Sequence, residues 1–479
     1  MRLRPGRALV LLLCFFLLAG QRRAGAYSLL THEQLIDLTW QRSIVPLLLS
    51  RYPGLSTAQL DEARAYAYGG CVIQDIGYYP FGDQLFSDLT HYVRSGDFVV
   101  ALFRNAHNAD ELAFAIGALS HYVGDSLGHS LATNVAVPVE FPNLRAKYGS
   151  TVNYGEGKHQ HVQTEFAFDI SEIAHHHMAP IHYLRHIGLK VPVKQLALAF
   201  YQNYGLSEDF SVRRGRRFNV RAYRFATRTF IPRIAYAVTL LHRKHEPAEP
   251  DTPEAIELEK EVAAMAAENH WDAYRRHAGI GTYLLAGFLF ILPKVGPLSL
   301  VAVKGPTPDT ESEYIHSVAL STSVIRRMLA RFTPPEKRDL HAAGSSASVG
   351  SVPSRTPPPN RGDGDDVPLA SRDPHHPLPN RDLDTGRVVQ PGGYPLTDAT
   401  YAGLLHRLTQ QRTTPIPPGI KEDIQTYYSN LNLPITTKKD PDQWAQVQAD
   451  LKILDAMPTS RAPEPYPTYG DEAADGEPQ

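Results

Sequence analysis

Cysteine is scarce in this chain, which excludes a disulfide framework as the source of its stability. The sequence holds 2 cysteines, Cys14 and Cys71. Cys14 lies in an N-terminal segment that we expect to be removed, so Cys71 would remain alone in the mature protein, without an intramolecular partner. The fold must therefore be stabilised mainly by packing.

The N-terminal segment lacks an apolar run long enough to span a membrane comfortably. The run from Ala8 to Ala19 follows three arginines and is shorter than the about 20 residues that a membrane helix needs. The segment ends in Ala24-Gly25-Ala26, a pattern that signal peptidase accepts. We expect residues 1–26 to be a signal peptide cleaved after Ala26, so that a secreted or periplasmic protein begins at Tyr27.

An excess of positive charge is also missing. The formal net charge is −2, and the loss of the five arginines of residues 1–26, which contain no acidic residue, would bring it to −7. Nothing indicates a polyanion-binding surface, so we expect no specific nucleic-acid partner. The sequence has no phosphate-cradling glycine loop and no Ser/His/Asp arrangement with a nucleophile elbow.

Alternating patterns typical of strands are few, and helical patterns dominate. Ser56 opens an alanine-rich stretch that runs to Tyr68, and Asn108 opens another that runs to about Gly128. Further helical patterns cover about 163–177, 193–204, 219–243, 252–276 and 310–331. The sequence therefore predicts an all-α fold, with a multi-helix domain over residues 27–335.

The composition changes after that domain. Residues 336–395 are rich in proline, glycine, serine and charge, which predicts a disordered linker because such a segment buries too little apolar surface to fold. Amphipathic patterns then predict three helices at about 398–411, 420–431 and 443–457. We expect a small helical C-terminal module over 396–458 and a disordered tail over 459–479.

One apolar stretch, residues 281–303, allows two interpretations. It could dip into a lipid surface, or it could be a buried helix and turn of the main domain. We favour the buried helix, because Lys294 and two prolines interrupt the stretch.

A series of imidazole and carboxylate side chains carries the chemistry. His121, Asp125 and His129 recur every four residues on one face of a predicted helix, and His161 and Glu165 repeat the spacing. Two donors four apart on a helix can bind one metal ion without strain. A lone pair of this kind is usually a surface hydrogen bond or ion pair, but two such sets with three upstream donors favour metal. The full series is His32, Asp75, His91, His121, Asp125, His129, His161 and Glu165.

In order and spacing, this series resembles the zinc-dependent phospholipase C family of secreted bacterial enzymes, over roughly residues 27–245. More distantly it is similar to the fungal single-strand nucleases and the catalytic domain of glycosylphosphatidylinositol phospholipase D, which share the fold. The resemblance implies a helical domain with three zinc ions and a bridging hydroxide that attacks phosphorus. It assigns Asp75, His91, His121 and Asp125 to the first zinc, His129, His161 and Glu165 to the second, and His32, Asp125 and the backbone of Tyr27 to the third.

Two features depart from the family's pattern. Tyr27 replaces the usual tryptophan at the first mature position, a tolerable change because the ligand atoms are the backbone amine and carbonyl. The four-residue gap from Asp125 to His129 is shorter than in the small bacterial phospholipases and closer to the phospholipase D branch. The resemblance also implies that Asp75 is catalytic, orienting or deprotonating the nucleophile.

The sequence thus predicts a secreted, zinc-dependent phosphodiesterase, phospholipase C-like, with residues 27–335 as its catalytic domain. We expect about three Zn²⁺ ions per chain, a phospholipid or membrane surface as substrate, and a monomer. One alternative is a single-strand-specific nuclease of the same fold, which the spacing from Tyr27 to His32 favours and the acidic net charge opposes. The other is a non-catalytic surface-binding protein in which zinc is structural.

Overall fold

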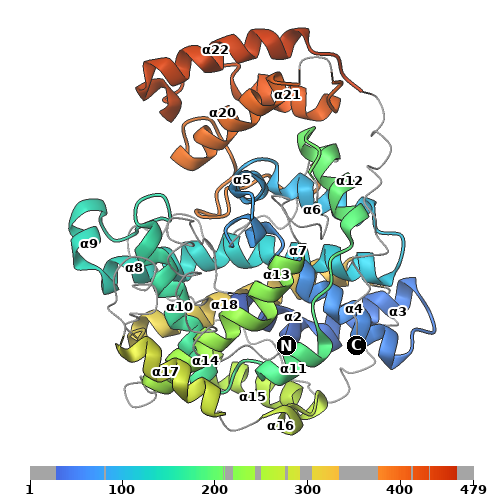
Figure 1. The fold of residues 1–479 in the computed structure, drawn as a ribbon, viewed down its shortest axis with the longest axis vertical. Helices are drawn as coiled ribbons and strands as arrows, with labels where there is room; N and C mark the ends of the chain where they lie inside the picture. The colour runs from blue at the N-terminus through green and yellow to red at the C-terminus, as the bar shows by residue number, and fades with distance from the viewer. Residues whose placement is uncertain are drawn as a thin grey trace.

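The protein is described by a computed structural model in which the described residues form helices and no strand (Figure 1). The predicted all-α class is confirmed for them. The predicted signal peptide, Tyr27, residues 334–375 of the predicted linker region and residues 461–479 of the predicted tail lie outside the described part. Among the described helices, none combines the length and apolar character that crossing a membrane requires. The structure describes residues 29–79, 82–208, 210, 220–242, 250–275, 279–291, 305–333, 376–411, 414–430 and 432–460.

The described helices lie along the chain in the following order. Those of the first half are α2 (Leu29–Thr39), η1 (Trp40–Ile44), α3 (Val45–Arg51), α4 (Thr57–Gly70), η2 (Gln74–Gly77), α5 (Gln84–Tyr92), α6 (Ser95–Arg104), α7 (Ala109–Gly128), η3 (His129–Thr133), α8 (Asn134–Glu140), α9 (Pro142–Tyr148), α10 (Lys158–Ala174), α11 (Ile181–Ile187) and α12 (Val193–Tyr204). Those of the second half are α13 (Val220–Phe225), η4 (Ala226–Phe230), α14 (Ile231–His242), α15 (Pro253–Glu268), α16 (Trp271–Tyr274), α17 (Ile280–Ile291), α18 (Pro308–Ala330), α20 (Pro395–Thr409), α21 (Pro418–Tyr427), η8 (Thr436–Lys439) and α22 (Pro441–Ala456).

Helix α7 is the centre of the fold. It begins at the expected cap, where the side chain of Asn108 accepts a hydrogen bond from the Glu111 backbone N–H. Helices α4, α6 and α18 pack around it. The approach of α4 is close, since a Cβ atom at Gly117 would lie 2.2 Å from the Ala67 carbonyl oxygen. The last four turns of α7 are consequently buried, and its polar residues must find partners inside the protein.

Helix α4 begins as its sequence predicts. Ser56 accepts a hydrogen bond from the Gln59 backbone N–H, and the Gln59 side chain accepts one from the Ser56 backbone, which completes a capping box. The predicted helix at 193–204 matches α12, whereas the one at 163–177 begins earlier, at Lys158.

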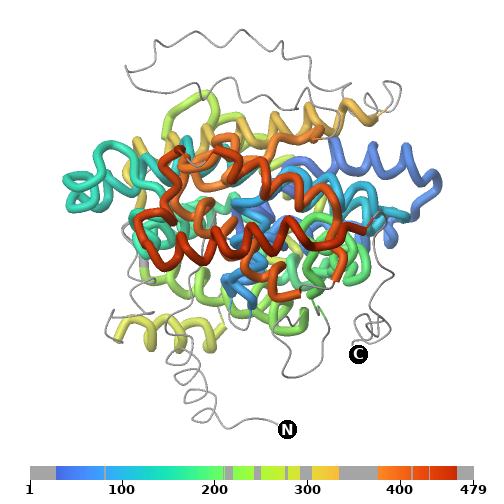
Figure 2. Tube along the Cα trace, turned by 90° about the horizontal axis from the view of Figure 1, so that it is seen from above, coloured from blue at the N-terminus to red at the C-terminus, as the bar shows by residue number. Residues whose placement is uncertain are grey.

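The C-terminal helices α20, α21 and α22 lie over α5, α6 and α12 at the top of Figure 1, and Figure 2 shows them crossing that face. Tyr401, Leu405 and Leu408 belong to the same buried apolar cluster as Phe86 and Tyr204 of the main domain. The predicted C-terminal helices are therefore present, but they share the core of the main domain.

Residues 376–395 differ from the expectation of a linker over 336–395. The Asn380 side chain accepts a hydrogen bond of 3.0 Å from the Asp97 backbone N–H. The Ser95 hydroxyl donates one of 2.6 Å to the Arg381 carbonyl oxygen. The described part of this range, residues 376–395, thus packs on the main domain, because this polar segment finds long-range partners on α6.

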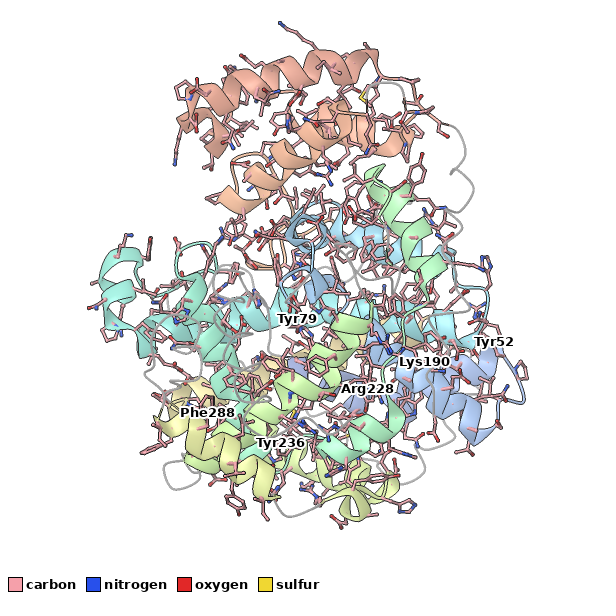
Figure 3. All side chains as sticks on the ribbon, viewed as in Figure 1. Tyr52, Tyr79, Lys190, Arg228, Tyr236 and Phe288 are labelled. Atoms are coloured by element: carbon pink, nitrogen blue, oxygen red, sulfur yellow. The ribbon has the colours of Figure 1, made fainter. Side chains whose placement is uncertain are left out.

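Helix α17 covers the described part of the apolar stretch, and its two faces differ. Ala286 and Leu289 are buried in a small cluster with residues of α10 and α14. Phe288 marks this helix in Figure 3. The prediction of a buried helix is wrong for the opposite face, where Ile280, Tyr283, Leu284, Phe290 and Ile291 are each at least 60 % exposed. Residues 292–303 of the stretch lie outside the described part.

Candidate metal centre

The eight predicted side chains come from six elements that meet inside the domain. None of the eight is more than 2 % exposed. His32 lies on α2, Asp75 on η2, His91 on α5, His121 and Asp125 on α7, His129 on η3, and His161 and Glu165 on α10. Within the described part of the chain they form three groups whose ligand atoms lie within 4.8 Å of one another: His32, His121 and Asp125; Asp75, His91 and His121; and His129, His161 and Glu165.

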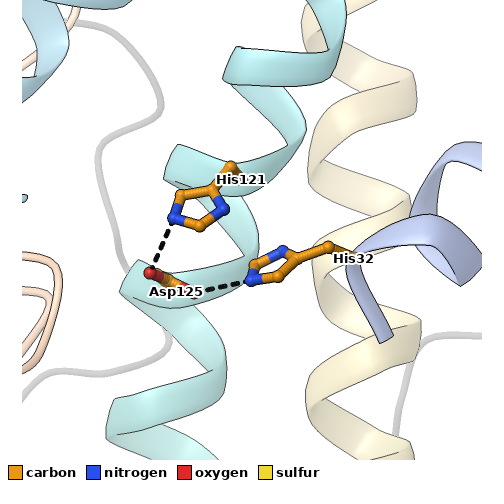
Figure 4. Close-up of side chains that lie close together, drawn as sticks. All are labelled: His32, His121 and Asp125. Atoms are coloured by element: carbon orange, nitrogen blue, oxygen red, sulfur yellow. Dashed lines mark ion pairs between the residues drawn. The ribbon is translucent and has the colours of Figure 1, made fainter. Parts of the chain in front are cut away.

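Asp125 lies between three imidazoles. Its Oδ1 atom is 3.2 Å from His32 Nε2, and its Oδ2 atom is 3.3 Å from His91 Nε2 and 3.1 Å from His121 Nε2. Figure 4 shows His32 and His121 directed at this carboxylate from two sides. Burial opposes ionisation, but the adjacent imidazoles, above all that of His121, outweigh it and hold the pKa of Asp125 well below its usual range. The position between two groups fits the predicted shared ligand.

Asp75 joins the group on the other side of His91. Its Oδ1 atom is 3.3 Å from His91 Nε2 and 4.0 Å from His121 Nε2. Asp75 follows the end of α4 on the short helix η2, which turns its carboxylate toward the interior.

The imidazoles of this region are oriented by backbone carbonyls. The Nδ1 atom of His91 is 2.7 Å from the Ser87 oxygen, and that of His121 is 2.9 Å from the Cys71 oxygen. A carbonyl only accepts, so each Nδ1 carries a proton, and the neutral form of each ring presents its Nε2 lone pair to the group. Metal-bound histidines are held in this way.

In the group of His129, His161 and Glu165, one short contact requires a proton or a cation between its two atoms. His161 Nε2 is 2.8 Å from Asn134 Oδ1, while His161 Nδ1 is 2.7 Å from Glu165 Oε1. Burial lowers the pKa of His161 to about 3, so its imidazole is neutral. Burial also raises the pKa of Glu165. Because His161 Nε2 donates to Asn134, the His161 Nδ1 lone pair faces the Glu165 carboxylate oxygen. Two acceptors can lie this close only if Glu165 is protonated or a cation lies between them. His129 Nε2 lies 3.6 Å from the same oxygen.

The donor set fits a divalent metal. Both carboxylate oxygens of Asp75 and both of Asp125 are buried and receive no hydrogen bond from the described residues. Buried carboxylates left in this state are costly, and a bound cation removes the cost. Imidazole nitrogen and carboxylate oxygen in groups of three are the ligands that zinc takes, with a further position left for water or substrate.

Comparison with known families agrees with this chemistry. Residues 31–207 match the model of the zinc-dependent phospholipase C family. This part of the chain belongs to that family. The match contains all eight side chains of the centre and ends before α13, so α17 and the C-terminal helices lie outside it. No curated protein and no solved structure matches the chain.

A cavity of about 250 Å³ is lined by residues that pack against the centre, and none of the eight candidate ligands lines it. Two of its walls are Tyr78, whose ring centroid is 5.4 Å from that of His91, and Tyr154, 5.6 Å from that of His161. Asp88 and Lys158 add one acidic and one basic side chain, and α20 forms part of the lining. Two tyrosines of the lining thus pack against histidines of two ligand groups, and a helix outside the family match helps to enclose the cavity.

Sequence reasoning missed two residues that contact the ligands. Asn134 bonds to His161, and Asp384 lies 3.5 Å from His129. Asn134 follows η3 without a metal-ligand spacing, and Asp384 falls in the range predicted to be a linker, so no local pattern pointed to either.

Proposed function

We propose that this protein is a secreted phosphodiesterase that hydrolyses phospholipids at a centre of about three zinc ions. The observation that carries the proposal is the convergence of eight buried imidazoles and carboxylates within residues that match the zinc-dependent phospholipase C family. The family supports phospholipase C-like chemistry on lipid, and the geometry supports zinc.

The three groups suggest how the ions would be held. Asp75, His91, His121 and Asp125 would hold the first zinc, and His129, His161 and Glu165 the second. His32, Asp125 and the backbone of Tyr27 would hold the third. Zinc in such a site lowers the pKa of a bound water to about 7 and neutralises charge on phosphate oxygens.

Asp75 is the residue to which we assign a catalytic role. One of its oxygens faces His91, and neither of its oxygens receives a hydrogen bond from the described residues. The oxygen that does not serve as ligand can accept the proton of an attacking water. We propose that substrate approaches through the neighbouring cavity, whose lining includes Tyr78, packed against His91, and Tyr154, packed against His161.

The exposed face of α17 supports a lipid surface as the partner. The helix contains no charged residue, and it exposes two isoleucines, a leucine, a phenylalanine and a tyrosine along its length. An apolar face of this kind is costly in water and favourable at a membrane interface. Its other face packs on α14, which packs on α10, the helix that carries His161 and Glu165. We therefore propose that α17 docks on phospholipid bilayers.

Vesicle binding tests the docking role of α17. Phe290→Ser and Ile291→Ser together should weaken sedimentation with phosphatidylcholine vesicles while leaving turnover of a soluble short-chain phosphodiester unchanged. Ile256→Ser on α15, at 43 % exposed, is the matched surface control. Equal vesicle binding by the α17 variant and the control would exclude docking through this helix.

Activity and metal content together test the main proposal. The purified mature chain should hold about three zinc ions and release phosphocholine and diacylglycerol from phosphatidylcholine, identified by mass spectrometry. His129→Ala should abolish turnover and spare most of the fold. Turnover on single-stranded nucleic acid but not on lipid would favour the nuclease, and full zinc content without turnover on either would favour the binding protein. Release of the alcohol head group with phosphatidic acid would show cleavage of the other ester bond.

The third zinc connects export with assembly of the site. We propose that cleavage after Ala26 frees the amine of Tyr27, which then binds metal with His32. A chain that retains residues in front of Tyr27 has an amide in place of that amine and should hold one zinc fewer than the mature chain. Equal zinc content in the two forms would exclude the terminal ligand.

A further inference from the structure

Asp384 contacts the centre from outside the family match. Its Oδ1 atom is 3.5 Å from His129 Nδ1, and the residue is 2 % exposed. The Nε2 atom of the same imidazole faces Glu165 Oε1 at 3.6 Å. Asp384 therefore lies on the side of His129 opposite to the ligand group, where a carboxylate can accept the Nδ1 proton and leave Nε2 for metal.

The carboxylate of Asp384 is itself fixed by two phenols. Its Oδ2 atom accepts hydrogen bonds from the Tyr92 hydroxyl at 2.9 Å and the Tyr394 hydroxyl at 2.6 Å. The Tyr394 oxygen in turn accepts one of 3.0 Å from the Gly155 backbone N–H. Held by residues of α5 and of its own segment, the carboxylate cannot turn away from His129 without breaking these bonds.

The backbone of Asp384 acts on the second imidazole of the same group. Its carbonyl oxygen accepts a hydrogen bond of 2.8 Å from Asn134 Nδ2. The Asn134 amide must then direct Oδ1 the other way, and that oxygen is 2.8 Å from His161 Nε2. His161 consequently donates from Nε2 and presents the Nδ1 lone pair to Glu165. Asp384 thus lies against His129 through its carboxylate and is connected to His161 through Asn134.

The segment around Asp384 is seated directly on the helices that carry the ligands. The Leu383 backbone N–H donates to the His91 carbonyl oxygen at 3.1 Å. Gly386 has φ +68°, and a Cβ atom there would lie 2.3 Å from the Ser126 carbonyl oxygen of α7. Glycine permits both the left-handed backbone and this close approach. Contacts of Leu383 and Gly386, on either side of Asp384 in the chain, therefore hold Asp384 beside the centre.

We propose that Asp384 is a positioning residue of the metal centre, which orients His129 through its carboxylate and His161 through Asn134. The C-terminal part of the chain then completes the metal-binding site of the family domain. The inference rests on the proposed zinc centre. Its physical basis is that the partners of metal-bound histidines fix the ring and its tautomer, and losing one weakens metal binding roughly 10- to 100-fold.

Zinc titration of the full mature chain against a chromophoric chelator tests the proposal. In Asp384→Ala, one zinc should bind roughly 10- to 100-fold more weakly than in the wild type, while the others keep their affinity. Asp384→Asn retains an acceptor oxygen and should restore part of the loss, and this variant decides the question if the alanine variant does not fold. With Co²⁺ in place of zinc, both variants should show an altered visible spectrum, because the geometry at one ion has changed.

Asp382→Asn is the matched control. Asp382 is 4 % exposed in the same segment, and its carboxylate accepts hydrogen bonds from the backbone N–H and the hydroxyl of Thr385. Its zinc affinities and cobalt spectrum should equal those of the wild type. A loaded wild type with unchanged affinity and spectrum in both Asp384 variants, or equal changes in Asp382→Asn, would overturn the positioning role alone. A wild type that binds no zinc would overturn the proposed centre itself.

Discussion

His161 Nε2 lies 2.8 Å from Asn134 Oδ1, so an uncharged amide decides which imidazole nitrogen faces Glu165. This residue is predicted to act on metal affinity without being a ligand. Asn134→Ala should lower the affinity for one zinc ion by roughly 10-fold or more, and competition with a chelator measures this affinity. The matched control is Asn105→Ala, which removes an equally buried asparagine that bonds to Ala101 and Gln202. Equal zinc affinity in the two variants would contradict the role of Asn134.

The position of Asp125 between three imidazoles predicts an unequal loss of metal. Asp125→Ala should remove two zinc ions, because its two oxygens face different groups, whereas Glu165→Ala should remove one. Elemental analysis of the purified variants measures both losses. Asp398→Ala, which removes a fully buried carboxylate of α20, should leave the zinc content unchanged. The same loss for Asp125→Ala and Glu165→Ala would contradict the shared position.

Asp382 predicts a pH-dependent stability that is separate from metal. Burial raises its pKa to about 7, against hydrogen bonds from Thr385 that lower it. Between about pH 4 and pH 7 the folded state keeps a proton that the unfolded state has released, so the free energy of unfolding falls as the pH rises through this range. Asp382→Asn stays neutral throughout and should be more stable than the wild type at pH 8, by at most about 4 kcal/mol. The difference should vanish near pH 4.

Chemical denaturation at the two pH values measures this difference. A constant difference between the variant and the wild type would show that Asp382 does not titrate with folding.

The buried pair of Arg64 and Asp37 predicts a large loss of stability without loss of metal. Arg64 bonds to Asp37 and to Asn269, and its guanidinium lies over the ring of Trp40. Arg64→Met leaves the Asp37 carboxylate buried without its cationic partner, which should lower the free energy of unfolding by about 3–5 kcal/mol.

Urea denaturation of the zinc-loaded protein measures this loss. Arg42→Met, which removes an arginine from a partly exposed pair with Glu261, should cost less than about 1 kcal/mol. Similar losses for the two variants would contradict the assigned difference between buried and exposed pairs.

Much of this protein could be predicted from local sequence patterns. The caps at Ser56 and Asn108 mark the starts of α4 and α7, because a side-chain acceptor satisfies backbone N–H groups within one turn. The ligands on α7 and α10 could be found because residues four apart share a helix face. Those interactions depend only on neighbours in the chain.

The contacts between segments that are distant in the sequence were decided by the tertiary structure. Asp384 reaches His129 from a polar segment whose composition predicts disorder, and its order comes from partners such as Asp97 and Ser95 on α6. The exposed face of α17 could not be predicted either, since an apolar helix has the same sequence pattern whether its second face is covered or open. Local spacing determined which side chains could bind metal. Packing decided how they are grouped and which residues orient them, because the free energy of those contacts depends on segments that meet only in the folded chain.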